Sequence, residues 1–293
     1  MKIGLIVWIG LILVGCGGAS KRGGSAENPL FSGSGQPESQ PVSERSADPD
    51  RIVENLPESE AAPEIPVAEE ASRDQYSNLA EALKNQNEGR VLSSAGAILG
   101  KNAKDQKALN AMGVYYYRTG RPEMARLLWA RALKDNPNSP SLANNMGLLM
   151  LRDDKPELAV REFRKALSQN SSHWEASANL GALHLKFLNY EAAKTYLSEA
   201  YEDRPKDVAV AVNYAIALRG LGQLDEAKRI YERLGAEKSD QTLVLFNYAV
   251  LLIEYLNDKS KGLEVINKVR YYQTDTDIMK RANQLAERAQ QIN

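Results

Sequence analysis

The sequence predicts an all-α protein built as a solenoid of about five to six helix-turn-helix units. The first observation is a row of small residues that recurs at intervals of 34 without drift: Gly113, Gly147, Gly181, Ala215 and Ala249. The second is a parallel row twelve residues later, which keeps the same interval: Ala125, Ala159, Ala193 and Ala227. A sustained period of this length is typical of stacked helical pairs, in which each unit buries its apolar face against its neighbours.

Apolar residues around these rows fall at the spacing of a helix face. In the first clear unit, Leu109, Gly113 and Tyr116 share one helix face, and Trp129 belongs to the matching face of a second helix. Because glycine costs about 1 kcal/mol relative to alanine inside a helix, glycines kept at one register indicate helices that approach too closely for a Cβ. Pro137 then ends the unit, since proline cannot continue a helix.

The period sets the expected boundaries of the folded part, residues 71–293. We expect units near residues 72–105, 106–139, 140–173, 174–207, 208–241 and 242–276, followed by a closing helix over 277–291. The first unit is less regular, as expected of a terminal unit with a wet outer face. The second helix of the last unit is one residue out of phase, which indicates a single insertion near Asn257 to Ser260.

This pattern resembles the tetratricopeptide repeat family over about residues 71–293. The resemblance implies antiparallel helical pairs whose first helices line a concave surface. It implies a protein-binding scaffold rather than one particular activity, because such repeats serve very many pathways.

The first fifteen residues, 1–15, have the form of a secretory signal peptide. After a short basic start, residues 3–14 are apolar and too few to span a bilayer as a helix, which needs about 20 residues. The run ends in Leu13-Val14-Gly15-Cys16, which resembles the lipobox of bacterial lipoproteins. The resemblance implies cleavage before Cys16 and lipidation of that cysteine, including palmitate; a lone buried thiol is the alternative. No other cysteine is present, so no intramolecular disulfide can form.

The residue after the cysteine helps to predict whether the lipid lies in the inner or the outer membrane. Gly17 is not the aspartate that holds many such lipoproteins in the inner membrane. By this resemblance we expect a lipid anchor in the outer membrane of a diderm bacterium, with the repeats in the periplasm, although surface exposure stays open. In an organism with a single membrane, the lipid would anchor the chain to the outer face of that membrane.

Residues 16–70 differ in composition from the repeats. The part from 17 to 70 holds six of the 20 glycines and seven of the 12 prolines, and its four basic and eleven acidic residues give a net charge of −7. Low hydrophobicity combined with net charge predicts a disordered tether, because such a segment buries too little apolar surface to offset the entropy of ordering. Residues 71–293 carry +5, without the basic stripes and interleaved aromatics typical of nucleic-acid binding.

Motifs for catalysis, metals and cofactors are absent from the sequence. Of the two histidines, His184 occupies a core row and His173 lies in a turn between repeats. No metal-ligand spacing, phosphate-binding glycine loop or nucleophile motif is present. The sequence therefore predicts no enzyme, no cofactor and no metal.

A row of asparagines is the strongest candidate for partner contact: Asn145, Asn179, Asn213 and Asn247. Each lies two residues before the small residue of its unit, on the helix that the family resemblance places along the concave surface. An amide offers both a donor and an acceptor, so such a ladder could bond the backbone of an extended peptide; packing within the repeats is the alternative. Six flanking apolar residues are expected in the same groove, some of them buried between repeats: Tyr117, Leu148, Leu151, Leu185, Ile216 and Phe246.

These expectations combine into one functional hypothesis and an alternative. The hypothesis is an outer-membrane lipoprotein whose repeats bind a segment of another envelope protein and assist assembly of a machine such as a type IV pilus or its secretin. One anchor, one tether and one repeat array resemble the pilotin lipoproteins of type IV pilus biogenesis, and also the lipoproteins of gliding-motility complexes. The alternative is a structural component of a gliding-motility, secretion or peptidoglycan-associated complex; the oligomeric state stays open.

Overall fold

A computed structural model of the chain describes residues 72–237, 242–272 and 276–291. Within these ranges the structure consists of thirteen α-helices and one π-helical turn, η2, with no strand. The expected signal peptide, Cys16 and the expected tether lie outside the described residues. The all-α architecture predicted from the repeat period is confirmed.

The helices follow one another as six pairs and a closing helix. The first three pairs are α1 (Arg73–Lys84) with α2 (Glu88–Lys101), α3 (Gln106–Arg118) with α4 (Pro122–Asp135), and α5 (Pro140–Arg152) with α6 (Pro156–Gln169). The next are α7 (Trp174–Lys186) with α8 (Tyr190–Asp203), α9 (Val208–Gly220) with α10 (Leu224–Glu237), and α11 (Thr242–Val250), extended by η2 (Leu251–Tyr255), with α12 (Lys259–Tyr271). The closing helix is α13 (Thr276–Gln291).

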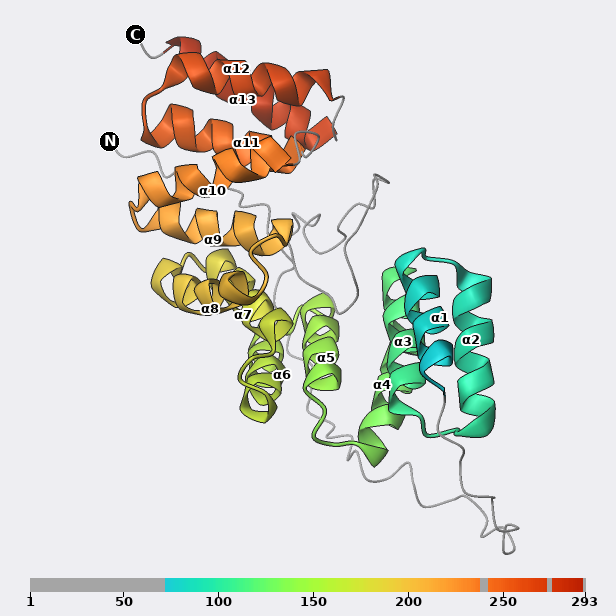
Figure 1. The fold of residues 1–293 in the computed structure, drawn as a ribbon. Helices are drawn as coiled ribbons and strands as arrows, with labels where there is room; N and C mark the ends of the chain where they lie inside the picture. The colour runs from blue at the N-terminus through green and yellow to red at the C-terminus, as the bar shows by residue number, and fades with distance from the viewer. Residues whose placement is uncertain (1–71, 238–241, 273–275, 292–293) are drawn as a thin grey trace, which may run out of the picture.

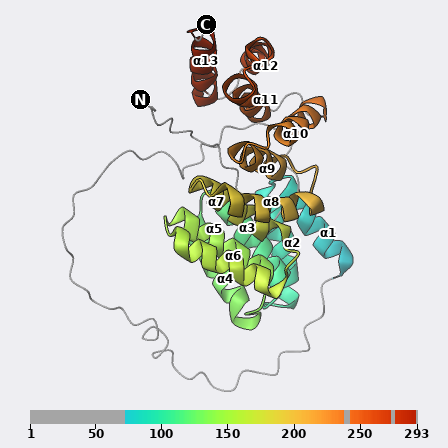
Figure 2. The same cartoon turned by 90° about the vertical axis from the view of Figure 1, so that its left-hand side faces the viewer.

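The pairs stack in chain order, so that the molecule is a solenoid with α1 near one end and α13 at the other (Figure 1). Figure 2, turned by 90°, shows α9 to α13 extending from the group formed by the earlier helices. Contacts are made between the two helices of a pair and between adjacent pairs, including first helix to first helix for α7 with α9 and for α9 with α11. The core is therefore divided among clusters along the stack, the largest running from Ala182 to Ala289, rather than gathered in one central cluster.

The glycine row marks the closest approach of paired helices, as the sequence predicted. A methyl group on each glycine would lie well inside contact distance of the large side chain on the partner helix: 2.2 Å from Trp129 at Gly113, 2.5 Å from Phe163 at Gly147 and 2.4 Å from Leu197 at Gly181. All three large side chains are buried. The glycines thus leave space that an aromatic or leucine side chain of the second helix fills.

The sixth pair departs from this regularity. Its second helix begins 17 residues after the start of α11, whereas 16 residues separate the corresponding starts in the four preceding pairs. The extra residue lies in η2, where the amide of Leu256 donates to the carbonyl of Leu251 at 3.0 Å. The sequence placed the insertion near Asn257 to Ser260; it lies earlier because a π-turn closes i to i+5 bonds and takes up one residue without ending the helix.

Candidate partner-binding surface

The four predicted asparagines lie inside the stack of first helices. No more than 5% of any of them is exposed: Asn145, Asn179, Asn213 and Asn247. The amide nitrogen of Asn145 donates to Oδ1 of Asn110 at 2.7 Å, and that of Asn179 donates to Oδ1 of Asn144 at 3.0 Å. Both bonds join a first helix to the first helix of the preceding pair. The amides of Asn145 and Asn179 therefore connect adjacent repeats.

The expectation that this ladder faces a groove is corrected by its burial. Buried amides need hydrogen-bond partners, and Asn110 and Asn144 supply them at a spacing of 35 residues, one more than the repeat. That spacing is visible in the sequence and is the signal that could have identified both residues. Asn247 differs, since its amide donates to the carbonyl of Leu243 in its own helix at 2.9 Å. Contact between these amides and a partner stays a prediction.

Most of the apolar groove residues are buried as well. Leu148, Leu185, Ile216 and Phe246 are between 0% and 5% exposed. Of the six, Tyr117 and Leu151 are partly exposed. These side chains thus pack between neighbouring first helices. Burial between repeats is the alternative that the sequence left open.

Tyr117 is also held within the repeats. Its hydroxyl donates to the carbonyl of Leu148 at 3.4 Å, and the guanidinium of Arg152 lies 5.7 Å from its ring centroid. Burial raises the pKa of the Tyr117 hydroxyl, so this group stays a protonated donor.

Two large apolar side chains are exposed in the turn between α7 and α8. Phe187 is 59% exposed and Leu188 is 57% exposed. Leu188 has φ of 57°, in the left-handed region. At the equivalent position, two turns use Gly120 at 78° and Gly222 at 75°, and two others use Gln86 at 51° and Asp154 at 57°. This conformation costs a non-glycine residue about 1–2 kcal/mol. An exposed apolar pair kept in a costly turn is a candidate for partner contact.

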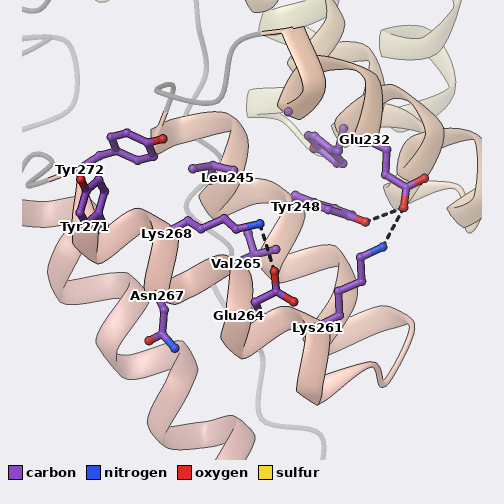
Figure 3. A pocket seen from close by; sticks show the side chains of 12 residues that line it. Glu232, Leu245, Tyr248, Lys261, Glu264, Val265, Asn267, Lys268, Tyr271 and Tyr272 are labelled. Carbon is purple, nitrogen blue, oxygen red and sulfur yellow. Dashed lines mark hydrogen bonds and ion pairs between the residues drawn. The ribbon is translucent and has the colours of Figure 1, made fainter.

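A cavity of about 590 Å³ opens between α10, α11 and α12 (Figure 3). Its lining combines four tyrosines, two apolar residues, two lysines, two glutamates, one asparagine and one glycine: Tyr231, Glu232, Gly235, Leu245, Tyr248, Lys261, Glu264, Val265, Asn267, Lys268, Tyr271 and Tyr272. The sequence did not predict this cavity. The one signal of it is the register break between α11 and α12, which separates the regular repeats from this part of the stack.

Ion pairs fix the polar side of the cavity. The carboxylate of Glu232 accepts from the Tyr248 hydroxyl at 2.8 Å and from Nζ of Lys261 at 3.0 Å (Figure 3). These hydrogen bonds lower the pKa of Glu232, the one from Lys261 most. Hydrogen bonding to Tyr248 first, and to Glu232 second, raises the pKa of Lys261. Both groups stay charged at neutral pH, so they suit recognition rather than proton transfer.

The apolar side of the cavity suits a hydrophobic or aromatic side chain. Leu245 and Val265 are buried beside it, and Tyr271 and Tyr272 stand at its rim with 80% and 38% of their surface exposed. Exposed tyrosines beside a cavity offer apolar contact area together with hydroxyls that can bond a partner. The arrangement is that of a binding site for part of another molecule.

Both histidines have structural contacts. His173 is the N-cap of α7: its Nδ1 accepts from the amide of Ala176 at 3.3 Å, and its Nε2 lies 3.3 Å from the hydroxyl of Ser141. His184 stacks on Tyr196, with ring centroids 5.6 Å apart. Burial lowers the pKa of each imidazole.

Within residues 72–237, 242–272 and 276–291, no three His, Cys, Asp or Glu side chains are grouped so that they could hold a metal ion. Across the same ranges, no helix has both the length and the apolar character needed to cross a bilayer.

Family models and solved structures agree with this fold. Two models of the tetratricopeptide repeat match the chain, one over residues 110–173 and one over residues 189–245. The stacked pairs are thus a tetratricopeptide-repeat solenoid, a fold that generally serves as a scaffold for protein interaction. No curated protein matches the sequence.

Three solved structures illustrate the likeness. PilW, described as a widely conserved type IV pilus biogenesis factor, is 18% identical, with a TM-score of 0.60 over 72% of this chain and 99% of that chain. PilF of Pseudomonas aeruginosa is 21% identical, with a TM-score of 0.53 over 63% of this chain and 88% of that one. YrrB, described as a TPR protein with an unusual peptide-binding site, is 19% identical, with a TM-score of 0.51 over 65% and 97%. At these identities the likeness shows a shared fold.

Proposed function

We propose that this chain is a non-enzymatic protein-binding scaffold that assists assembly of a cell-envelope machine such as a type IV pilus or its secretin. The observation that carries the proposal is the likeness of the repeat array to PilW, which extends over 99% of that protein. The lipobox-like motif that ends at Cys16 supports a place in the envelope. The cavity and the turn at Phe187 and Leu188 supply surface for a partner segment.

Binding is expected to centre on exposed aromatic and apolar groups. Interface energy usually concentrates in a few aromatic anchors. Among the described residues the exposed aromatic candidates are Phe187, Tyr255, Tyr271 and Tyr272. An apolar side chain of the partner would enter the cavity, while the Glu232–Lys261 pair at its edge would bond the partner's polar groups.

Recovery of partners from detergent-solubilised envelope, followed by mass spectrometry, tests the assembly role. The variant Tyr271→Ala with Tyr272→Ala is expected to lower partner recovery about tenfold, the size of one lost anchor of about 1.4 kcal/mol. The matched control is Met124→Ala with Leu127→Ala, which removes two side chains that are 44% and 65% exposed on α4, far along the stack from the cavity. Equal recovery with both variants would remove the cavity from the proposal.

The anchor is tested by Cys16→Ser. Lipid holds a protein at a membrane because each buried CH₂ contributes about 0.8 kcal/mol. The serine variant is expected to lose lipid and to leave the outer-membrane fraction, or to stay uncleaved. If the variant carries no lipid and still sediments with the outer membrane, the anchor is elsewhere.

The alternative role is a structural component of a gliding-motility, secretion or peptidoglycan-associated complex. A structural component stays in the finished complex at fixed stoichiometry, whereas an assembly factor is recovered with free subunits. Quantifying the chain in the purified machine and in the subunit pool separates the two roles.

A further inference from the structure

A buried arginine lies in the last turn of α9. Arg219 is only 4% exposed, although it forms no ion pair with any described carboxylate. Its Nη1 has no hydrogen-bond partner among the described residues. The equivalent position in the other clear repeats is held by uncharged residues: Tyr117, Leu151, Leu185 and Ile253. A guanidinium removed from water needs hydrogen bonds and a countercharge, so its retention requires an explanation.

Capping of the helix end does not explain it. An arginine near a helix C-terminus can donate to free carbonyls, as Arg152 does toward the carbonyl of Tyr117 at 3.5 Å. Within the described residues Arg219 makes no such bond. Its guanidinium carbon lies 5.2 Å from the ring centroid of Tyr255. The aromatic contact offsets part of the cost of burial and leaves the donors unused.

A second unused donor lies beside this arginine. The hydroxyl of Tyr231 is buried and has no hydrogen-bond partner among the described residues. Burial raises the pKa of this hydroxyl to about 12, and the charge on Arg219 opposes that rise. The hydroxyl is therefore protonated at neutral pH and can donate. Two buried donors within electrostatic reach of each other fit one shared acceptor.

Tyrosines enclose the two donors. Tyr190 packs against the end of α9, where a methyl group on Gly220 would lie 2.3 Å from its ring. Tyr255 covers the guanidinium and is itself 41% exposed. It is the last residue of η2 and is followed by the C-cap Leu256, as α7 and α9 are followed by their C-caps Phe187 and Leu221. Tyr255 thus lies over Arg219 at the end of the π-turn, and such turns recur at functional sites.

We propose that Arg219 and the Tyr231 hydroxyl bind a carboxylate of the partner segment, and that Tyr255 is a cover that rotates aside to admit it. This inference rests on the proposed binding function and names the group that is recognised. A guanidinium matches a carboxylate with two parallel hydrogen bonds, and these bonds strengthen where water is excluded. The net charge of +5 on residues 71–293 also favours an acidic partner.

Peptide binding to the full chain tests this assignment by calorimetry. The probes are three peptides of the same length made of glycine, serine and leucine: one capped and amidated with a central glutamate, one with glutamine there, and one with a free C-terminal carboxylate and no acidic side chain. The glutamate peptide is expected to bind at least about tenfold more tightly than the glutamine peptide. The third peptide shows whether a terminal carboxylate serves equally.

The variant Arg219→Leu is expected to abolish that tenfold preference and to melt at the same or a higher temperature. Leucine is the residue at the equivalent position of α7, where it is fully buried as Leu185. The matched control Arg152→Leu removes an arginine with a structural contact, so it is expected to lower the melting temperature and to keep the preference. Tyr255→Ala, which uncovers Arg219, is expected to speed association of the glutamate peptide.

Three outcomes would overturn the proposal. One is a preference for glutamate that survives in Arg219→Leu, and another is a melting temperature that falls in that variant, since Arg219 would then be structural. The third is glutamate binding that occurs only after the acids of residues 17–70 are changed to amides, which would assign the site to the chain's own segment. Recovery of partners from solubilised envelope distinguishes a failure of this inference from a failure of the proposed function. If wild type and Arg219→Leu capture the same partner equally, the carboxylate site is contradicted while the scaffold function stands.

Discussion

The middle repeats and the C-terminal repeats of this solenoid share one sequence period but differ in how their paired helices pack. From α3 to α8, the small residue of each first helix is a glycine, and a large side chain of the paired helix occupies the space beside it, as Phe163 does at Gly147. From α9 onward the small positions are Ala215 and Ala249, and the first helix of the sixth pair contains a π-turn. The buried arginine and the cavity both lie in this second region.

The difference indicates that residues of the middle region serve mainly packing, whereas residues of the C-terminal region are available for recognition. In the middle region, local pattern, close approach and amide pairing between repeats all favour one packing arrangement, and the exposed pair Phe187 and Leu188 lies in a turn outside that packing. In the C-terminal region, one extra residue interrupts the register, and the buried donors of Arg219 and Tyr231 have no hydrogen-bond partner among the described residues. Departures from local consistency are expected at functional sites, so the comparison favours the C-terminal region for binding.

The largest effect is expected from filling the glycine row. Gly147→Ala would place a Cβ 2.5 Å from the buried ring of Phe163, and overpacking of this kind costs about 1–3 kcal/mol. The control is Gly96→Ala in α2, where a Cβ would meet nothing within 4 Å and the change should stabilise the helix by up to about 1 kcal/mol. Thermal melts of the two variants should move in opposite directions; a shared direction would contradict the close-approach account.

The next effect concerns the asparagines. Asn179→Ala removes the donor to Oδ1 of buried Asn144, and loss of a buried hydrogen bond costs about 1–3 kcal/mol. Asn247→Ala removes a bond within one helix and should cost less, so the melting temperature should fall more for Asn179→Ala. An unchanged melt of Asn179→Ala together with weaker partner recovery would restore the hypothesis that the ladder binds a partner.

The sequence predicts the fold far better than the site, for physical reasons. A row of glycines in the sequence indicates directly that two helices approach closely, because only a residue without Cβ permits the contact between Gly113 and Trp129. An asparagine row reports only a position on a helix, and whether the amide meets solvent or Asn110 depends on how adjacent first helices are rotated. The Tyr255 contact that covers Arg219 comes from the π-turn, and the sequence shows this turn only as a shift of one residue.

The smallest effect is a dependence of stability on pH in the middle region. Burial lowers the pKa of His173, more than the nearby Glu175 carboxylate raises it, and burial also lowers the pKa of His184. The unfolded chain therefore takes up protons at a higher pH than the folded chain. The free energy of unfolding that the two neutral imidazoles contribute should be fully present above the ordinary histidine pKa of about 6.5. It should fall as the pH drops below that value.

His173→Asn isolates one of the two groups. Asparagine caps α8 in the same way, since Oδ1 of Asn189 accepts from the amide of Ala192 at 3.2 Å, so the helix cap should survive. Melts between pH 7.5 and 5.5 should show a smaller acid loss in the variant than in wild type. Hydrogen exchange should place that loss in α5 to α8, because both histidines lie there. A loss confined to the C-terminal helices would mean that the acid-sensitive groups belong to the cavity instead.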